Sequence, residues 1–183
     1  MAVKITELFI REQKPPRGLL TVEWIAISYL VLTLLMMGML WTKLPNPEAM
    51  LWGRFQFLVV TLAMWLVYRM LPCRLLMFAR IVVQMLFLGW GYPDTYELNR
   101  VLPNLDHLFA TWEQSLFGCQ PALVFAQKVP FGWFSELMCL GYVSYFPLML
   151  IVYLYYFFQR YREFQMAAFV ILGSFFIYYV IFI

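Results

Sequence analysis

The sequence predicts an all-α, polytopic helical membrane protein with about five transmembrane helices and short interfacial helices in one outer loop. Of its 183 residues, 64% are apolar and only 13% are charged, which leaves too little polar surface to cover a water-soluble globule. Apolar runs also recur that approach about 20 residues, the length that crosses a hydrocarbon core of about 30 Å. Both observations favour the same fold class.

Five stretches meet or approach this length. They cover residues 22–41, 55–70, 75–92, 134–158 and 165–183. The LPCR connector joins the second and third stretches, and because its Pro72 disfavours helix in the preceding residue, we expect a tight helical hairpin there. The sequence therefore predicts one transmembrane domain over residues 1–183, with an interfacial loop at 93–132.

The distribution of basic residues predicts the orientation. Eight of the 13 Lys and Arg residues fall on the side of the amino terminus, four fall on the other side, and Arg80 lies within a span. Because cytoplasmic loops carry the excess of Lys and Arg, we expect a cytoplasmic amino terminus and an outer Ile183. The basic residues form no stripe that could follow phosphates, so we expect membrane lipids as partners and no nucleic acid.

The loop at 93–132 has the periodicity of helices lying at the membrane surface. Apolar residues recur at helical spacing at positions Leu105, Leu108, Phe109, Trp112 and Leu116. We expect Asn104 to cap this helix and Gly118 to end it. A second short helix is expected from Pro121 until Pro130, and both helices should lie flat at the surface.

Three side chains of the first loop helix, Asp106, His107 and Glu113, are candidates for the wall of a headgroup pocket. The alternative is an ordinary solvated face. Asp106 and Glu113 lie two turns apart, roughly 10 Å along the helix, which is too far for one metal ion. A lone histidine without a second ligand at metal spacing adds little, so we expect neither a metal nor a cofactor.

Polar residues within the spans are further pocket candidates. Arg80 and Gln84 share one helix face, and a charge at such depth is costly unless it pairs, snorkels or faces water, which makes Arg80 a functional candidate. The structural alternative is that Arg80 reaches the inner interface and pairs with Glu23. Glu136 opens the fourth stretch and is either a pocket residue or a side chain that favours the helix dipole.

Two stretches resemble a known family. They read LDHLFATWEQSLFGCQPALVFAQ and WFSELMCLGYVSYFPLML. They resemble the amino-terminal portion of bacterial membrane proteins of the type-two phosphatidic acid phosphatase superfamily, in the branch similar to inositol phosphorylceramide synthases, which are inositolphosphotransferases. The matching positions are Asp106, Glu113, Phe117, Gly118, Pro121, Phe134, Ser135, Glu136, Leu137, Tyr142, Ser144 and Tyr145.

The resemblance implies lipid phosphatase or phosphotransferase chemistry, but the catalytic motifs of the family are absent. Those motifs are Lys-x6-Arg-Pro, Pro-Ser-Gly-His and Ser-Arg-x5-His-x3-Asp, whereas this sequence has no Arg-Pro, Pro-Ser or Ser-Arg dipeptide and one histidine. No catalytic residue is therefore assigned. Because the first basic motif of the family follows a span that ends outside the cell, we expect the chain to be cut just before the chemistry begins.

The first hypothesis is therefore the non-catalytic half of a lipid phosphatase or phosphotransferase of the bacterial inner membrane. It would act on a lipid phosphate at the extracytoplasmic face, where phosphatidic acid, an isoprenyl diphosphate and a phosphosphingolipid partner all fit, as do hydrolysis and transfer. The alternative is a small membrane scaffold or partner-binding protein without chemistry. The oligomeric state stays open.

Overall fold

The computed structural model describes residues 8–129 and 131–183, and helices account for most of them. The elements are α1 (Thr21–Leu40), α2 (Pro47–Met70), α3 (Arg74–Val101), α4 (Asp106–Phe117), α5 (Pro121–Lys128), α6 (Gly132–Gln159) and α7 (Tyr161–Phe182). Within the described residues, α1, α2, α3, α6 and α7 are long and apolar enough to cross a membrane. The predicted all-α membrane fold is confirmed.

The chain divides into two compact units, and each is described by itself. The bundle unit contains the chain up to Leu102 together with Tyr153–Ile183, and the loop unit is Pro103–Val152. The sequence predicted a single transmembrane domain, and the division of that domain into two units was not predicted. The helices α1, α2, α3 and α7 belong to the bundle unit, whereas α4, α5 and most of α6 belong to the loop unit.

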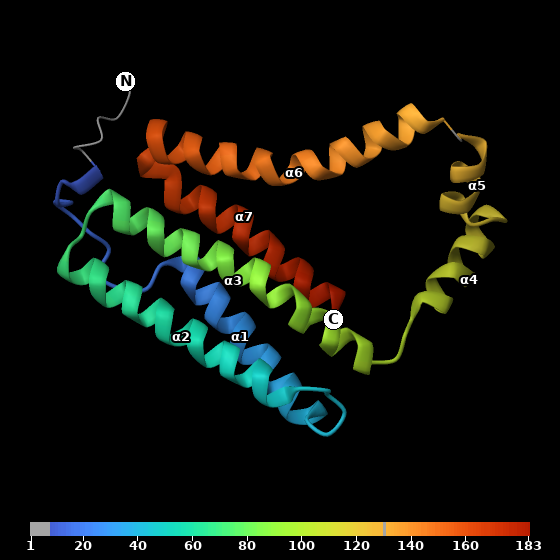
Figure 1. Ribbon diagram of the computed structural model, residues 1–183, viewed down its shortest axis with the longest axis horizontal. Helices are drawn as coiled ribbons and strands as arrows, with labels where there is room; N and C mark the ends of the chain where they lie inside the picture. The colour runs from blue at the N-terminus through green and yellow to red at the C-terminus, as the bar shows by residue number, and fades with distance from the viewer. Residues whose placement is uncertain (1–7, 130) are drawn as a thin grey trace. The chain divides into compact units, whose positions relative to one another are not determined.

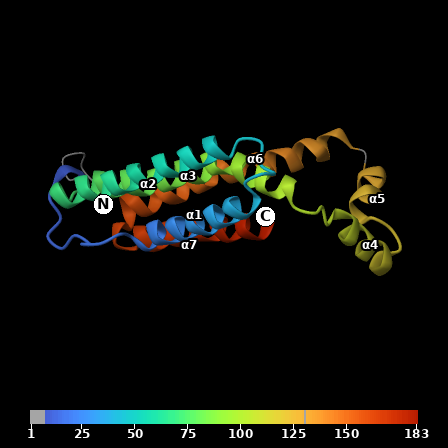
Figure 2. The ribbon, with the colours of Figure 1, turned by 90° about the horizontal axis from the view of Figure 1, so that it is seen from below.

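In the bundle unit, α1, α2 and α7 pack around α3. Figure 1 shows α3 between α2 and α7, and Figure 2 shows α1 along α7. The α1 helix also packs against α2 and α3. Short connectors reverse the chain between α1, α2 and α3, so α2 runs opposite to its two neighbours. The side-chain amide of Asn99, near the end of α3, donates to the carbonyl of Phe182 at 2.5 Å. This bond joins the carboxyl ends of α3 and α7, which are therefore parallel.

Aromatic side chains make up much of the bundle core. The rings of Phe57 and Phe87 stack between α2 and α3, and Phe87 also contacts Phe176 of α7. A smaller apolar cluster lies where α1 ends, and its buried members are Met37, Leu44, Met50 and Leu98. Because Leu44 lies in the connector between α1 and α2, this cluster holds the connector against α3.

The helices α2 and α3 are longer than the apolar pattern predicted. We expected them at 55–70 and 75–92, but α2 begins at Pro47 and α3 continues to Val101. Charged residues near the helix ends lower the hydropathy without ending the helix, and Pro47 suits a first helical turn, where its missing N–H needs no partner. Residues 93–101 of the predicted loop at 93–132 are therefore helical.

Pro93 does not end α3, although it lacks the N–H that an internal helical position normally donates. In the turn before it, the carbonyl of Leu88 accepts a hydrogen bond from the hydroxyl of Tyr179 at 3.1 Å. The carbonyl that Pro93 leaves without a helical donor is that of Gly89, the next residue. The bond from Tyr179 therefore fastens α7 to α3 beside the proline turn and does not replace the missing bond.

The loop unit contains the two short helices that the sequence predicted. Gly118 ends α4 with a φ of 67°, in the left-handed region that favours glycine, and α5 begins at Pro121 as expected. The predicted cap is displaced by one residue. Leu105 is the N-cap residue of α4, but the side-chain oxygen of Asn104 accepts a hydrogen bond from the backbone N–H of Asp106 at 2.7 Å.

Candidate functional site

Two buried ion pairs form the polar interior of the bundle unit. Glu23 pairs with Arg80 near the end where α1 begins, and Arg54 pairs with Asp94 toward the opposite end. Charged side chains in a membrane span are functional candidates by default. Hydrogen bonds extend each pair to further helices or to the segment before α1.

Glu23 and Arg80 form a two-pronged ion pair between α1 and α3. Arg80 donates from Nε to Oε1 of Glu23 at 2.8 Å and from Nη2 to Oε2 at 2.5 Å, and both side chains are fully buried. Oε2 of Glu23 also accepts the backbone N–H of Leu20 at 2.7 Å. One carboxylate thus accepts two bonds from the guanidinium and one from an N–H at the start of α1 that has no helical acceptor.

Tyr68 links this pair to the segment that precedes α1. The guanidinium carbon of Arg80 lies 4.9 Å from the centre of the Tyr68 ring, and the Tyr68 hydroxyl donates to Oε2 of Glu12 at 2.8 Å. The hydroxyl of Tyr161 donates to the other carboxylate oxygen of Glu12. Glu12 is therefore held by α2 and α7 together, which fastens the amino-terminal segment across this end of the bundle.

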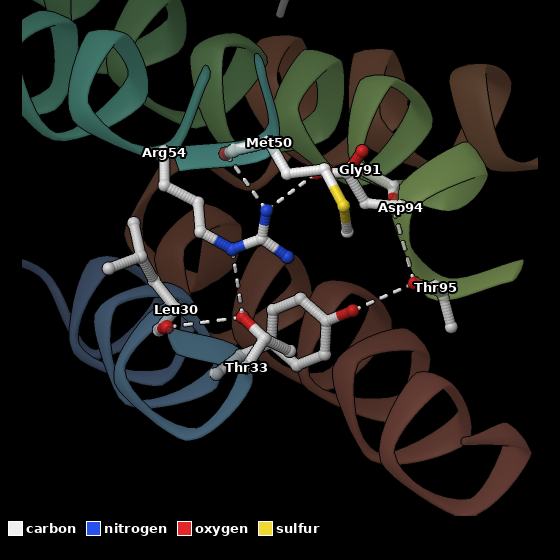
Figure 3. A network of polar contacts seen from close by, with 8 residues as sticks. Leu30, Thr33, Met50, Arg54, Gly91, Asp94 and Thr95 are labelled. Atoms are coloured by element: carbon white, nitrogen blue, oxygen red, sulfur yellow. Dashed lines mark hydrogen bonds and ion pairs between the residues drawn. The ribbon is translucent and has the colours of Figure 1, made fainter. Parts of the chain in front are cut away.

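Arg54 is held from three sides at the other end of the bundle unit, as Figure 3 shows. Its Nη1 donates to Oδ2 of Asp94 at 2.6 Å and to the carbonyl of Met50 at 3.0 Å, and its Nε donates to Oγ1 of Thr33 at 3.3 Å. The side chain of Arg54 is 4% exposed and that of Asp94 is 22% exposed. The pair joins α2 to α3, and Thr33 adds α1.

A second set of hydroxyl contacts lies beside this pair. Oγ1 of Thr95 is 3.1 Å from the carbonyl of Gly91 and 2.8 Å from the hydroxyl of Tyr29. A threonine hydroxyl carries one proton, and because the Gly91 carbonyl can only accept, Tyr29 donates to Thr95. This bond connects α1 to α3 one residue along from Asp94 (Figure 3).

The chemistry of these two networks is that of paired charges. Each combines one guanidinium with one carboxylate, so the pair carries no net charge and the cost of burying either ion alone is offset. A carboxylate that accepts two guanidinium bonds, as Glu23 does, is occupied as an acceptor. The geometry therefore supports a role in fixing the helices rather than in moving protons.

Arg80 and Gln84, predicted from the sequence as pocket candidates, lie together in the bundle interior. Arg80 pairs with Glu23, which confirms the partner that the structural alternative named, and both side chains are fully buried. Gln84 donates from Nε2 to Oγ1 of Thr61 at 3.3 Å. Within the described residues, Oε1 of Gln84 and Nη1 of Arg80 are buried without a hydrogen-bond partner.

The other predicted pocket residues, Asp106, His107, Glu113 and Glu136, are exposed in the loop unit. Nδ1 of His107 lies 3.1 Å from the carbonyl of Asn104, which makes Nδ1 the donor of that bond. No hydrogen bond or ion pair between described residues joins Glu136 to the three candidates on α4. Glu136 also lies beyond the first turn of α6, so its interpretation as a residue that favours the helix dipole is wrong.

Sequence reasoning missed the pair of Arg54 and Asp94. Arg54 was placed in a loop before the second span, and Asp94 in the outer loop, because both spans were predicted too short. The signal that could have found them is the start of α2 at Pro47, after which its buried residues recur at helical spacing. This face carries Met50, Gly53, Arg54, Phe57 and Thr61.

Comparisons of the chain with protein-family models, curated proteins and solved structures find no match.

Proposed function

We propose that this chain is the membrane-embedded, non-catalytic part of a lipid phosphatase or phosphotransferase of the type-two phosphatidic acid phosphatase superfamily. In this proposal the protein lies in a bacterial inner membrane with its amino terminus in the cytoplasm. The lipid phosphate binds at the extracytoplasmic face, and the residues of this chain hold the helices in place without taking part in phosphoryl transfer.

One observation carries the scaffold role: the charged residues buried in the bundle unit pair with one another. Arg80 and Glu23 form one pair, and Arg54 and Asp94 form the other, so these side chains are engaged in helix packing. The class of chemistry is supported by the resemblance of the two stretches around α4, α5 and α6. Phosphoryl transfer in that family needs histidines and basic residues whose motifs this chain lacks.

The proposed orientation is tested by labelling single cysteines from one side of the membrane. The background variant lacks Cys73, Cys119 and Cys139, and it receives either Gln13→Cys or Lys43→Cys at opposite ends of the bundle unit. A membrane-impermeant maleimide should label the cysteine at position 43 in intact cells and the one at position 13 only after permeabilisation. The reverse pattern would contradict a cytoplasmic amino terminus.

The proposed activity is tested on the product of the whole reading frame that contains this sequence. If that frame also encodes two further histidines and the basic motifs of the family, we expect its purified product to release or transfer phosphate from a lipid phosphate in the presence of EDTA. Activity that a chelator abolishes and zinc or magnesium restores would contradict the proposal. A frame without these motifs, with no turnover, would favour a partner-binding scaffold.

The scaffold role is tested separately, by comparing the amount of folded protein with the turnover of each folded molecule for the product of the same reading frame. Arg54→Gln should reduce the amount of folded protein while leaving the turnover of each folded molecule within about twofold, because Arg54 contacts other helices and no reacting group is assigned to it. Exposed Glu48, near the same end of the bundle, gives the matched control Glu48→Gln. A large loss of turnover per folded molecule would place Arg54 in the chemistry.

A further inference from the structure

A cavity of about 400 Å³ opens at the end of the bundle unit where α1 and α3 finish. Its walls come from the connector between α1 and α2 and from the last turns of α3, and they are Lys43, Pro45, Glu97, Arg100 and Val101. Ligand sites in proteins commonly have volumes of about 300–1,000 Å³. The cavity is therefore large enough for a small polar ligand.

The cavity gathers charges of both signs that are not paired with one another. Within the described part of the chain, the ion pairs are Arg54 with Asp94, Arg80 with Glu23, and Arg160 with Glu163, so the three charged residues of the cavity form none.

Glu97 carries the strongest sign of a missing partner. Its Oε2 is buried and has no hydrogen-bond partner among the described residues. A buried carboxylate oxygen without a donor is costly, and Lys43 and Arg100 in the same wall are exposed and form no ion pair with it. Glu97 therefore offers an acceptor to a cation, beside two basic side chains that can bind an anion.

The frame of the cavity is well supported. Leu44, between two wall residues, is buried in the apolar cluster with Leu98, and Asn99 is bonded to the carbonyl of Phe182 at the end of α7. The backbone N–H groups of Lys43 and Leu44 both donate to the carbonyl of Leu40. The walls are thus anchored on both sides.

The length of α3 indicates that the cavity lies at the level of lipid headgroups. The α3 helix has 28 residues, about 42 Å at 1.5 Å per residue, which exceeds a hydrocarbon core of about 30 Å. Its last turns, which carry Glu97 and Arg100, therefore extend into the interface if the apolar part of α3 spans the core. Charged side chains are stable at that depth.

We propose that this cavity binds the zwitterionic phosphoethanolamine headgroup of a membrane phospholipid. The phosphate would be bound by Lys43 and Arg100, and the ammonium group, which a short ethylene link holds close to the phosphate, would donate to Oε2 of Glu97. Charge-assisted hydrogen bonds of this kind are the strong ones in proteins. The binding requires no phosphoryl transfer, so it is independent of the function proposed above.

The test measures which lipids remain bound to the purified full chain. The protein is reconstituted with equal amounts of phosphatidylethanolamine and phosphatidylglycerol of the same acyl chains, extracted into mild detergent, and analysed by native mass spectrometry. We expect phosphatidylethanolamine to be retained about tenfold over phosphatidylglycerol, the effect of one hydrogen bond to a charged group. Equal retention, or a preference for phosphatidylglycerol, would overturn the proposal.

Variants separate the two halves of the headgroup. Glu97→Gln should abolish the preference for phosphatidylethanolamine while phosphatidylglycerol still binds, and Lys43→Gln with Arg100→Gln should reduce the retention of both lipids. The control Glu48→Gln, at an exposed acid near the same end of the bundle, should change nothing. An unchanged lipid ratio in the Glu97→Gln protein, with its thermal unfolding preserved, would overturn the assignment.

Competition distinguishes a membrane lipid from a soluble headgroup. Glycerophosphoethanolamine has the same phosphate and ammonium without acyl chains, and we expect it not to displace the bound phospholipid at equal concentration. Displacement at equal concentration would contradict the assignment of the cavity to a membrane lipid. Because the lipid assay contains no substrate turnover, its failure would leave the proposed enzymatic function standing, and a failure of the activity assay would leave the lipid site standing.

Discussion

Glu23 of α1 and Arg80 of α3 meet inside the bundle unit through two hydrogen bonds of 2.8 and 2.5 Å. Both side chains are fully buried, although 56 residues separate them along the chain. Removing either charge leaves the other one buried without a counter-charge, which is costly. Substitutions at this pair therefore test how α1 and α3 pack.

Arg80→Gln should lower the free energy of unfolding by about 3–5 kcal/mol, because the carboxylate of Glu23 loses its counter-charge while staying buried. The measurement is equilibrium unfolding of the purified protein in mixed micelles with increasing SDS. The double variant Glu23→Gln, Arg80→Gln contains no buried charge at this position and should be more stable than either single variant. A double variant that is less stable than both would contradict the assigned ion pair.

The contacts of Arg54 predict a graded series at the other end of the bundle unit. Asp94→Asn removes the anion at 2.6 Å and should lower the stability by about 1–3 kcal/mol. Thr33→Val removes the 3.3 Å bond to Nε and the local 3.1 Å bond to the carbonyl of Leu30, neither of which joins opposite charges, and should lower it by about 1 kcal/mol or less. Both variants keep the side-chain volume. The same unfolding assay checks the order, and a larger loss from Thr33→Val would refute it.

Gly53 and Trp90 predict a steric effect between α2 and α3. A Cβ on Gly53 would lie 1.8 Å from Cη2 of Trp90, so Gly53→Ala must displace the indole ring. We expect a loss of about 1–3 kcal/mol, the range for overpacking. Trp90→Ala in the same chain should reduce the penalty, because it removes the clashing ring.

Gly89 of α3 provides the matched control for this substitution. Apart from the neighbouring residues and the backbone of its own helix, no atom lies within 4 Å of the Cβ that Gly89→Ala would add, and alanine is the better helix former by about 0.5–1 kcal/mol. We therefore expect Gly89→Ala to leave the stability unchanged or raise it. If Gly53→Ala were as harmless as Gly89→Ala, the close packing of Trp90 on α2 would be wrong.

Glu12 predicts how the segment before α1 is fastened. The hydroxyls of Tyr68 and Tyr161 donate to the carboxylate of Glu12, and Glu12→Gln weakens both bonds by removing its charge. The substitution should therefore speed hydrogen exchange of the backbone amide at position 12, which donates to the carbonyl of Pro72. The expected change is about tenfold or more, the effect of losing a hydrogen bond to a charged group. Hydrogen exchange with mass spectrometry of the amino-terminal peptides measures it.

Exposed Gln13 provides the control for Glu12, because Gln13→Ala alters the neighbouring side chain without touching either tyrosine bond. Equal exchange in the two variants would show that the carboxylate of Glu12 does not hold the segment.

The apolar pattern predicted the spans because burial in lipid requires long runs of apolar residues, and such runs are visible without knowing what packs against what. The signals for helix ends in the loop unit were also predictive, because they depend on single residues and not on tertiary contacts. Gly118 ends α4 because its left-handed conformation is a property of one residue, and Pro121 starts α5 because its ring suits a first turn. The pairing of Arg80 with Glu23 was also foreseen, since a buried charge needs a partner and Glu23 lay at the right depth.

The ends of α2 and α3 were predicted wrongly because a hydropathy pattern treats a charge as the end of a span. Arg54 and Asp94 are both charged and both helical, and each is tolerated because the other neutralises it from 40 residues away. Only the tertiary structure could supply that information, since the partner of Arg54 is chosen by how α2 packs on α3. The cavity at Glu97 belongs to the same class, because its walls come together only when Leu44 packs against Leu98. The sequence by itself determined which segments are helical and apolar, and the packing of the helices decided which charges lie inside and which face a ligand.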